Sequence, residues 1–439
     1  MKRTHLLSLA SVVFAILTTA NAQEKTIFRY GGDIRLRQEI WDEIPLPTDN
    51  PSIARNGYNN SYRLRTRLYG SINVLNNLNL NLRAVNELHE TPSGAEAYDW
   101  PDELVFDLIN LELKDFLGNG SKLVLGRQEF ILGSGRLIMD GTPLDGSRTS
   151  YVNGLLLHKP LSEDLSADIF AVYTSDEDDL AIGNLHRKLP GYSPAVDGRD
   201  EAAAGLFINS RSEKSKGSLY YIWKHETSAK KSDGEKIDNA DIHVIGAWIK
   251  PEFTDTISGE FEYAYEFDPN DENGIDASMA FAGLTYTHRL NHISTFFGIN
   301  YEYLSGDDPT TDRNEAFNPI LCRAPLISEL VIYCYDSEGA GNWNNLHYPH
   351  LTMGFSEESG HNLTLTFGYM GAEENNSVGK GYNRGWLYTA HYGFPLFKGT
   401  KNGMGKTSGY VRLEILDPGD YYTSDRTAYF LRWQVSVAF

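Results

Sequence analysis

The sequence predicts an all-β protein, a transmembrane antiparallel β-barrel of about 18 strands. Three observations support this fold class. Apolar and polar residues alternate in segment after segment, which is typical of strands whose two faces meet different surroundings. The connections between these segments alternate between short and long. No apolar run after residue 22 reaches the about 18 residues that a spanning helix needs, so a membrane would be crossed by strands.

The first residues have the three parts of a secretory signal peptide. Lys2 and Arg3 are basic, residues 6–19 form an apolar run, and residues 20–22, Ala-Asn-Ala, are a small-residue cleavage site. We expect residues 1–22 to be removed on export; an uncleaved anchoring helix is the alternative. Residues 23–439 are expected to form one β-barrel domain, because no linker, repeat or low-complexity tract interrupts the alternation.

Eighteen alternating segments follow the signal peptide, and a single-chain bacterial barrel with both termini on one side needs an even number. They begin near Ile27, Ser61, Leu78, Glu103, Ser121, Tyr151, Asp164, Asp200, Gly217, Asp241, Thr254, Ala277, His292, Leu346, Gly360, Arg384, Lys406 and Thr427. The connections after even-numbered segments are short, and those after odd-numbered segments are longer. Such asymmetry is typical of outer-membrane barrels, which have short turns on one side and long loops on the other.

The final segment shows the alternation most clearly. One face carries Tyr429, Leu431, Trp433, Val435, Val437 and Phe439, and the other carries Phe430, Arg432, Gln434, Ser436 and Ala438. A C-terminal phenylalanine that closes an alternating strand resembles the end of outer-membrane barrel chains. The longest connection runs from Ser305 to Asn345, and its length is exceptional for a loop. We expect it to form a lid or a constriction.

Composition and charge exclude several classes of protein. The chain has 26 tyrosines, 40 glycines and 41% hydrophobic residues, which indicates a folded body. Its formal net charge is −20, and it becomes more negative when Lys2 and Arg3 leave with the signal peptide. Nucleic acid is therefore not an expected partner, because no excess of positive charge is available to neutralise phosphates.

Two cysteines, Cys322 and Cys334, lie in the longest connection. In the oxidising compartment beyond the inner membrane such a pair is expected to form a structural disulfide, which would contribute roughly 3 kcal/mol. Two unpaired cysteines in a loop are the alternative.

Arginine side chains share one face in each of the first three segments. Arg35 and Arg37, for example, alternate with Ile34 and Leu36, so the arginines of one strand point the same way. Placing them in lipid would cost roughly 2 to 4 kcal/mol each at the bilayer midplane, so we expect them in the lumen. The same argument places Arg67 inside and Leu68 outside. The predicted lumenal set consists of Arg35, Arg37, Arg63, Arg65, Arg67 and Arg83.

These arginines are candidate anion-binding residues. Guanidinium groups bind carboxylate or phosphate bidentately and stay charged at any relevant pH. Eleven of the 21 arginines after the signal peptide lie between Arg29 and Arg148, whereas acidic residues gather in the long connections, so a basic lumen with an acidic rim is expected. A structural role is the alternative: the arginines would neutralise carboxylates in a plugged interior. The carboxylates available for this are Asp33, Glu39, Glu87, Glu112 and Glu129.

Two stretches resemble a known family, the alginate export porins of bacterial outer membranes. The first is Leu123–Phe130 (L-V-L-G-R-Q-E-F), with Gly133–Leu137 and Met139–Arg148 after it; the second is Tyr301–Asp308 with Glu315–Pro319. About a fifth of the chain carries this similarity. The resemblance implies a monomeric, eighteen-stranded barrel with an arginine-rich constriction that selects a uronate polymer. By motif position it adds Arg127, Arg136 and Arg148 to the substrate-binding residues.

The sequence thus predicts a porin of the bacterial outer membrane, surrounded by lipid and lipopolysaccharide. It would pass an anionic polysaccharide or oligosaccharide, such as an alginate-like uronate, by passive diffusion through an arginine-lined lumen. A general anion-selective nutrient porin is the alternative, and a surface β-protein that binds carbohydrate through its aromatic residues is a third interpretation. Direction of transport is not expected to be encoded, since a passive pore has none of its own.

No enzyme, cofactor or metal site is predicted. Histidines occur near serines, but no nucleophile elbow or triad-like spacing accompanies them; they are His288, His292, His347, His350 and His361. The acidic segment Asp268–Gly274 is similar to a calcium loop, except that its glycine comes one place late for that geometry. Calcium bridging to lipopolysaccharide at the rim stays open.

Overall fold

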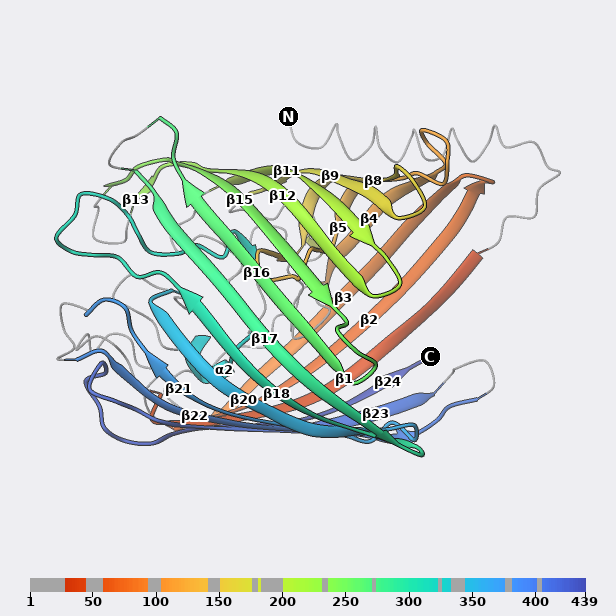
Figure 1. Cartoon of the computed structure of the whole chain (residues 1–439). Helices are drawn as coiled ribbons and strands as arrows, with labels where there is room; N and C mark the ends of the chain where they lie inside the picture. Colours follow the sequence, from red (N-terminus) through yellow and green to blue (C-terminus); the bar gives the residue numbers. More distant parts are fainter. Residues whose placement is uncertain are drawn as a thin grey trace.

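The computed structural model of the chain shows a closed wall of tilted antiparallel strands (Figure 1). It describes residues 28–44, 58–93, 104–140, 151–175, 181–182, 200–230, 236–270, 274–322, 326–332, 344–375, 381–400 and 405–439. The expected signal peptide, Arg148, Cys334 and the centre of the acidic segment, residues 271–273, lie outside these ranges. The disulfide therefore stays a prediction, although its partner Cys322 is buried.

Eighteen strands form the wall within the described residues. In barrel order they are β1 (Phe28–Asp42), β2 (Asn59–Leu75), β3 (Leu78–Ser93), β4 (Leu104–Lys114), β5 (Lys122–Gln128), β8 (Val152–Pro160), β9 (Leu165–Thr174), β11 (Glu201–Arg211), β12 (Ser215–Glu226), β15 (Ala240–Pro251), β16 (Ile257–Phe267), β17 (Asp276–Leu290), β18 (Ile293–Leu304), β20 (Leu346–Glu357), β21 (Asn362–Gly371), β22 (Asn383–Phe397), β23 (Lys406–Asp417) and β24 (Ala428–Ala438). Each strand pairs with the next, and β24 pairs with β1 from Asp33↔Ala438 to Asp42↔Tyr429. The predicted fold class is confirmed, and each predicted segment begins within three residues of its strand.

The connections alternate in length as predicted. Two residues join β2 to β3 and β17 to β18, whereas forty-one residues separate β18 from β20. In the described parts of the long connections lie seven short elements without a counterpart among the predicted segments: β6 (Phe130–Leu132), β7 (Ile138–Asp140), β10 (Ala181–Ile182), β13 (Ala229–Lys230), β14 (Lys236–Ile237), β19 (Leu321–Cys322) and α2 (Glu329–Ile332). None of the helices in the described residues is long and apolar enough to cross a membrane.

The two faces of the wall differ as the alternation predicts. On β1, Ile34 and Leu36 are 41% and 42% exposed, whereas the intervening Arg35 is 3% exposed. On β2, Leu68 is 56% exposed and the side chain of Arg67 is 17% exposed. The exterior is therefore apolar and the arginines lie inside, which confirms the predicted register of these strands.

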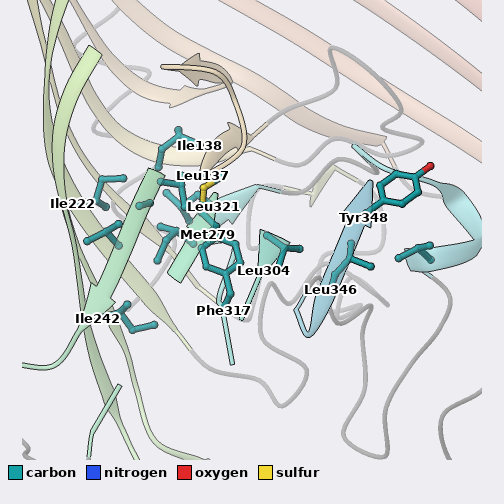
Figure 2. Packing of buried hydrophobic residues seen from close by; sticks show 14 of the residues in the cluster. Leu137, Ile138, Ile222, Ile242, Met279, Leu304, Phe317, Leu321, Leu346 and Tyr348 are labelled. Carbon is teal, nitrogen blue, oxygen red and sulfur yellow. The ribbon is translucent and has the colours of Figure 1, made fainter. Parts of the chain in front are cut away.

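Two long connections meet inside the barrel. Strand β6 pairs with β7 in the connection between β5 and β8. Strand β19, from the connection between β18 and β20, pairs with β7 in parallel, with Leu321 opposite Ile138. Figure 2 shows Leu137, Ile138 and Leu321 packed against residues of the wall, among them Ile222 and Met279.

The interior is consequently not polar throughout, and the expected basic lumen does not extend to the part of the wall formed by β12, β15, β17 and β18. Ile222, Ile242, Met279 and Leu304 face inward and are at most 4% exposed. They are covered by the loop side chains instead of water, so burying them stabilises the fold by about 25 cal/mol per Å² of apolar surface. On β15 both faces are therefore apolar, since Val244 is buried while its neighbour Ile245 is 58% exposed.

Candidate functional site

The pairing of β1 with β2 brings arginines side by side. Arg35 lies opposite Arg65, and Arg37 lies opposite Arg63. Directly opposite residues of antiparallel strands have side chains within reach of each other, so this part of the interior gathers like charges. Such a gathering is stable only when carboxylates lie among the arginines.

Carboxylates from neighbouring strands supply this compensation. Arg63 places Nη1 2.9 Å from Glu39 Oε2 and Nε 2.9 Å from Glu87 Oε1. Asp33 receives hydrogen bonds from Arg67 Nε at 2.8 Å and from Arg65 Nη2 at 3.3 Å. One carboxylate is thus shared by two guanidinium groups.

Arg35 and Arg37 lie deepest in this group. The Arg35 Nη2 atom is 3.9 Å from Glu87 Oε1. The Arg37 side chain is fully buried and donates from Nη2 to Gln434 Oε1 at 2.7 Å. It also donates from Nη1 to Glu39 Oε1 at 3.3 Å.

Two further arginines extend the group onto β23 and β24, and they were absent from the predicted set. Arg432 is 2% exposed and donates from Nε to Glu39 Oε1 at 2.7 Å. Arg412 donates from Nε to Glu414 Oε1 at 2.5 Å. The alternation could have predicted that both arginines face inward, because Arg432 follows the apolar Leu431 on the final strand and Arg412 follows Val411.

We call this group the arginine network. It consists of seven arginines, Arg35, Arg37, Arg63, Arg65, Arg67, Arg412 and Arg432, with five carboxylates, Asp33, Glu39, Glu87, Glu329 and Glu414. The positive charges exceed the negative ones in this set. An anion that enters the network would therefore meet several guanidinium groups close together.

Arg83 lies on β3, beside the network, and is held by two carboxylates. Its Nε is 2.8 Å from Asp107 Oδ1, and its Nη2 is 2.7 Å from Glu129 Oε2. Of the five carboxylates in the structural interpretation, four contact arginines, whereas Glu112 lies 3.8 Å from Lys114 and accepts a hydrogen bond from Asn79. A solute that bound these arginines would therefore compete with protein carboxylates.

Arg136, from the connection that contains β6 and β7, meets the opposite wall. Its Nη1 is 3.3 Å from Glu260 Oε1 and 3.5 Å from Glu262 Oε2, and its Nε is 3.6 Å from Glu302 Oε1. The guanidinium carbon lies 3.6 Å from the centre of the Phe281 ring, a cation–π contact. This side of the interior is acidic, and Arg136 is the loop cation that compensates it.

Arg127 is placed by a break in the alternation. Gly126 has a φ of 120°, and a Cβ there would lie 2.4 Å from Ile109 O, so glycine is required. Arg127 then donates from Nη1 to Phe106 O at 2.8 Å and from Nε to Asn153 Oδ1 at 3.0 Å. Arg127 thus holds the backbone of β4 at Phe106.

Acidic residues gather on the long connections, as the sequence suggests. Thr310 donates its backbone N–H and its hydroxyl to Asp308 Oδ1, both at 2.8 Å, which holds the pKa of that carboxyl below its usual value.

Among the described residues, no group of three or more His, Cys, Asp or Glu side chains is arranged to hold a metal ion.

Known structures share this fold. Over 93% of this chain and 98% of theirs, it is similar to Pseudomonas aeruginosa OccK5 (OpdH), with a TM-score of 0.55 and 12% identity. OccK2 (OpdF) of the same organism matches over 93% and 97%, with a TM-score of 0.55 and 11% identity. OccK11 (OpdR) matches over 94% and 96%, with a TM-score of 0.53 and 14% identity.

No protein-family model matches the chain, and comparison with curated proteins finds no similar sequence. The structural likeness, at such low identity, concerns the fold. That fold is a closed 18-strand antiparallel barrel, and an apolar exterior around a closed barrel suits lipid. The chain is accordingly a β-barrel of the bacterial outer membrane.

Proposed function

We propose that this barrel is a porin through which anionic solutes diffuse passively, and that the arginine network binds them in transit. The observation that carries the proposal is the gathering of seven arginines on the interior faces of β1, β2, β23 and β24. Porin activity also agrees with the fold shared with OccK5 (OpdH). A channel requires no catalytic group, so we propose no enzymatic activity.

We further propose that the solutes carry carboxylates, and that uronate units of an acidic saccharide are one such class. Successive inward residues on one strand are about 7 Å apart, so Arg63, Arg65 and Arg67 offer several binding positions along the barrel. A solute with several carboxylates would pass from one position to the next. Because two connections meet in the interior, we favour single units and short oligomers over a long polymer.

A general anion-selective porin is the second candidate. The sharing of Asp33 between Arg65 and Arg67 favours it, because this arrangement attracts small anions without a geometric requirement for a sugar. Block of the chloride current separates the two candidates. A uronate-binding porin should be blocked by uronate oligomers more strongly than by acetate, whereas a general anion porin should respond equally to both.

Ion selectivity in planar lipid bilayers tests the proposal. The wild-type protein should be anion-selective. Arg65→Gln with Arg67→Gln should reduce the preference for anions, and Asp33→Asn should increase it, because Asp33 neutralises both arginines. Arg211→Gln is the matched control, since this exposed arginine ends β11 beside a short turn. A cation-selective or non-conducting wild type, with the fold intact, would refute the proposal.

A further inference from the structure

A carboxylate from a connection occupies one arginine of the network. Glu329, in α2, accepts a hydrogen bond from Arg432 Nη1 at 2.6 Å, and both side chains are 2% exposed. On another edge of the same guanidinium, Arg432 Nε donates to Glu39 Oε1 at 2.7 Å. A charge-assisted bond of this length is strong, so Glu329 fills the position of an anion bound to Arg432.

Glu329 differs from the other carboxylates of the network in how it is carried. Asp33, Glu39, Glu87 and Glu414 lie on wall strands, whose backbones are fixed by pairing on both sides. Glu329 lies in a four-residue helix of the connection between β18 and β20. Within the described part of the network it is the one carboxylate whose backbone belongs to no wall strand.

Side-chain contacts and hydrogen bonds to Glu414 hold α2 against the wall. Ser328 donates its hydroxyl to Glu414 Oε2 at 2.6 Å. The backbone N–H groups of Glu329 and Leu330 donate to the same carboxylate at 3.2 and 3.1 Å. Leu330 and Val331 are buried in the interior apolar cluster. These contacts orient the Glu329 carboxylate towards Arg432 without including α2 in the sheet.

The connection reaches this position by crossing the barrel. Near its start, Asn318 N donates to Glu266 on β16 at 2.9 Å, and Ile320 O accepts from Lys224 on β12 at 3.0 Å. Strand β12 lies far from β24 in the barrel order. One segment thus joins two sides of the interior, and Glu329 is its contact with the arginine network.

We infer that Arg432 is a binding site for a solute carboxylate, and that Glu329 is a tethered competitor which occupies this site until the solute replaces it. This inference rests on the proposed function. The replacement conserves charge, because one carboxylate leaves the Arg432 guanidinium as another arrives. Without Glu329, the network holds seven arginines and four carboxylates, so a free solute anion is the species that restores the original charge.

Competition of this kind sets the concentration at which a solute binds. A group tethered to its site within one chain acts at an effective concentration of the order of millimolar, so only solute at comparable concentration displaces it. If Glu329 occupies Arg432 for about nine-tenths of the time, the apparent dissociation constant of the solute rises about tenfold. The device would keep the site closed at low solute concentration.

Glu329→Gln tests the inference in planar bilayers, with galacturonate as the probe and galactose as its uncharged counterpart. The measurement is the galacturonate concentration that halves the chloride current. It should fall about tenfold in Glu329→Gln, and galactose should have no effect in either protein. Glu112→Gln is the matched control, because Glu112 is a wall carboxylate beside Lys114 and outside the network.

A double substitution separates competition for Arg432 from a mere loosening of α2. In an Arg432→Gln background the site is absent, so Glu329→Gln should no longer change the half-blocking concentration. An equal change in both backgrounds would overturn the inference, as would an unchanged value in Glu329→Gln alone. Heat-modifiable migration on a gel would verify that each variant is folded. A wild type that galacturonate does not block would instead contradict the proposed function.

Discussion

Arg136 shows how a single residue determines whether one side of the interior is stable. It lies within 3.6 Å of Glu260, Glu262 and Glu302, and the side chains of Glu262 and Glu302 are 2% and 10% exposed. Carboxylates so deeply buried are expensive unless a cation accompanies them. The resemblance to alginate export porins suggests that Arg136 binds substrate. Its three carboxylate partners give it at least a structural role.

We expect Arg136→Gln to destabilise the barrel by about 3 to 5 kcal/mol, because the buried carboxylates lose their cation. The temperature at which fast gel migration is lost measures the effect. Adding Glu302→Gln should recover part of the lost stability, since one uncompensated charge is removed. Strict additivity of the two substitutions would contradict direct coupling between Arg136 and Glu302.

At the scale of elements, the connection between β18 and β20 determines the character of the interior. Its residues Phe317, Ile320 and Leu321 are buried in the interior apolar cluster, together with wall residues such as Met279. The length of this connection predicts a lid or constriction, and part of it, including Phe317, Leu321 and Leu330, is buried inside the barrel. A connection that covers apolar wall residues contributes to stability as well as to the width of the passage.

Replacing residues 306–344 with a short glycine and serine linker should therefore have two effects. Conductance should rise, because a segment that crosses the interior is gone. Thermal stability should fall, because Ile222, Met279 and Leu304 lose their apolar cover. Single-channel recording and the gel-migration temperature measure the two effects.

The control for this replacement is a similar change in the connection between β12 and β15. None of its described residues belongs to the interior apolar cluster, so conductance and stability should both stay close to wild type. Unchanged conductance after removal of residues 306–344 would show that the segment does not restrict the passage.

At the scale of the whole molecule, closure of β1 on β24 makes the barrel one cooperative unit. The last residue takes part, because Phe439 N donates to Gly32 O and Phe439 O accepts from Gly32 N, both at 2.9 Å. A closed barrel leaves no strand edge unpaired in lipid. Breaking it open exposes backbone groups on both edges at once, so unfolding should be concerted.

Heat-modifiable migration follows from this closure. Protein extracted in detergent without boiling should run faster on a gel than boiled protein, because the intact barrel is compact. It should also partition into the detergent phase, since residues such as Leu68 and Leu219, 56% and 65% exposed, form the exterior. Partition into the aqueous phase without detergent would contradict a membrane barrel.

Much of the candidate site could be predicted from the first two strands. The alternation of Arg35 and Arg37 with Ile34 and Leu36 gives their direction from a window of four residues. The alternation could not give the carboxylate partners of the arginines. Glu87, for example, reaches Arg63 only through the pairing of β2 with β3. Arg127 is a different case: the positive φ of Gly126 is a backbone feature that alternation cannot express.

By itself, the sequence determined the number of strands, the side of each short turn and the face on which the arginines lie. These properties are local, because a strand repeats every two residues and lipid and water sort the two faces. Only the tertiary structure decided that β7 pairs with β19 and that Glu329 meets Arg432, 103 residues away. Such contacts depend on barrel closure and on the paths of long connections, for which no short-range period exists.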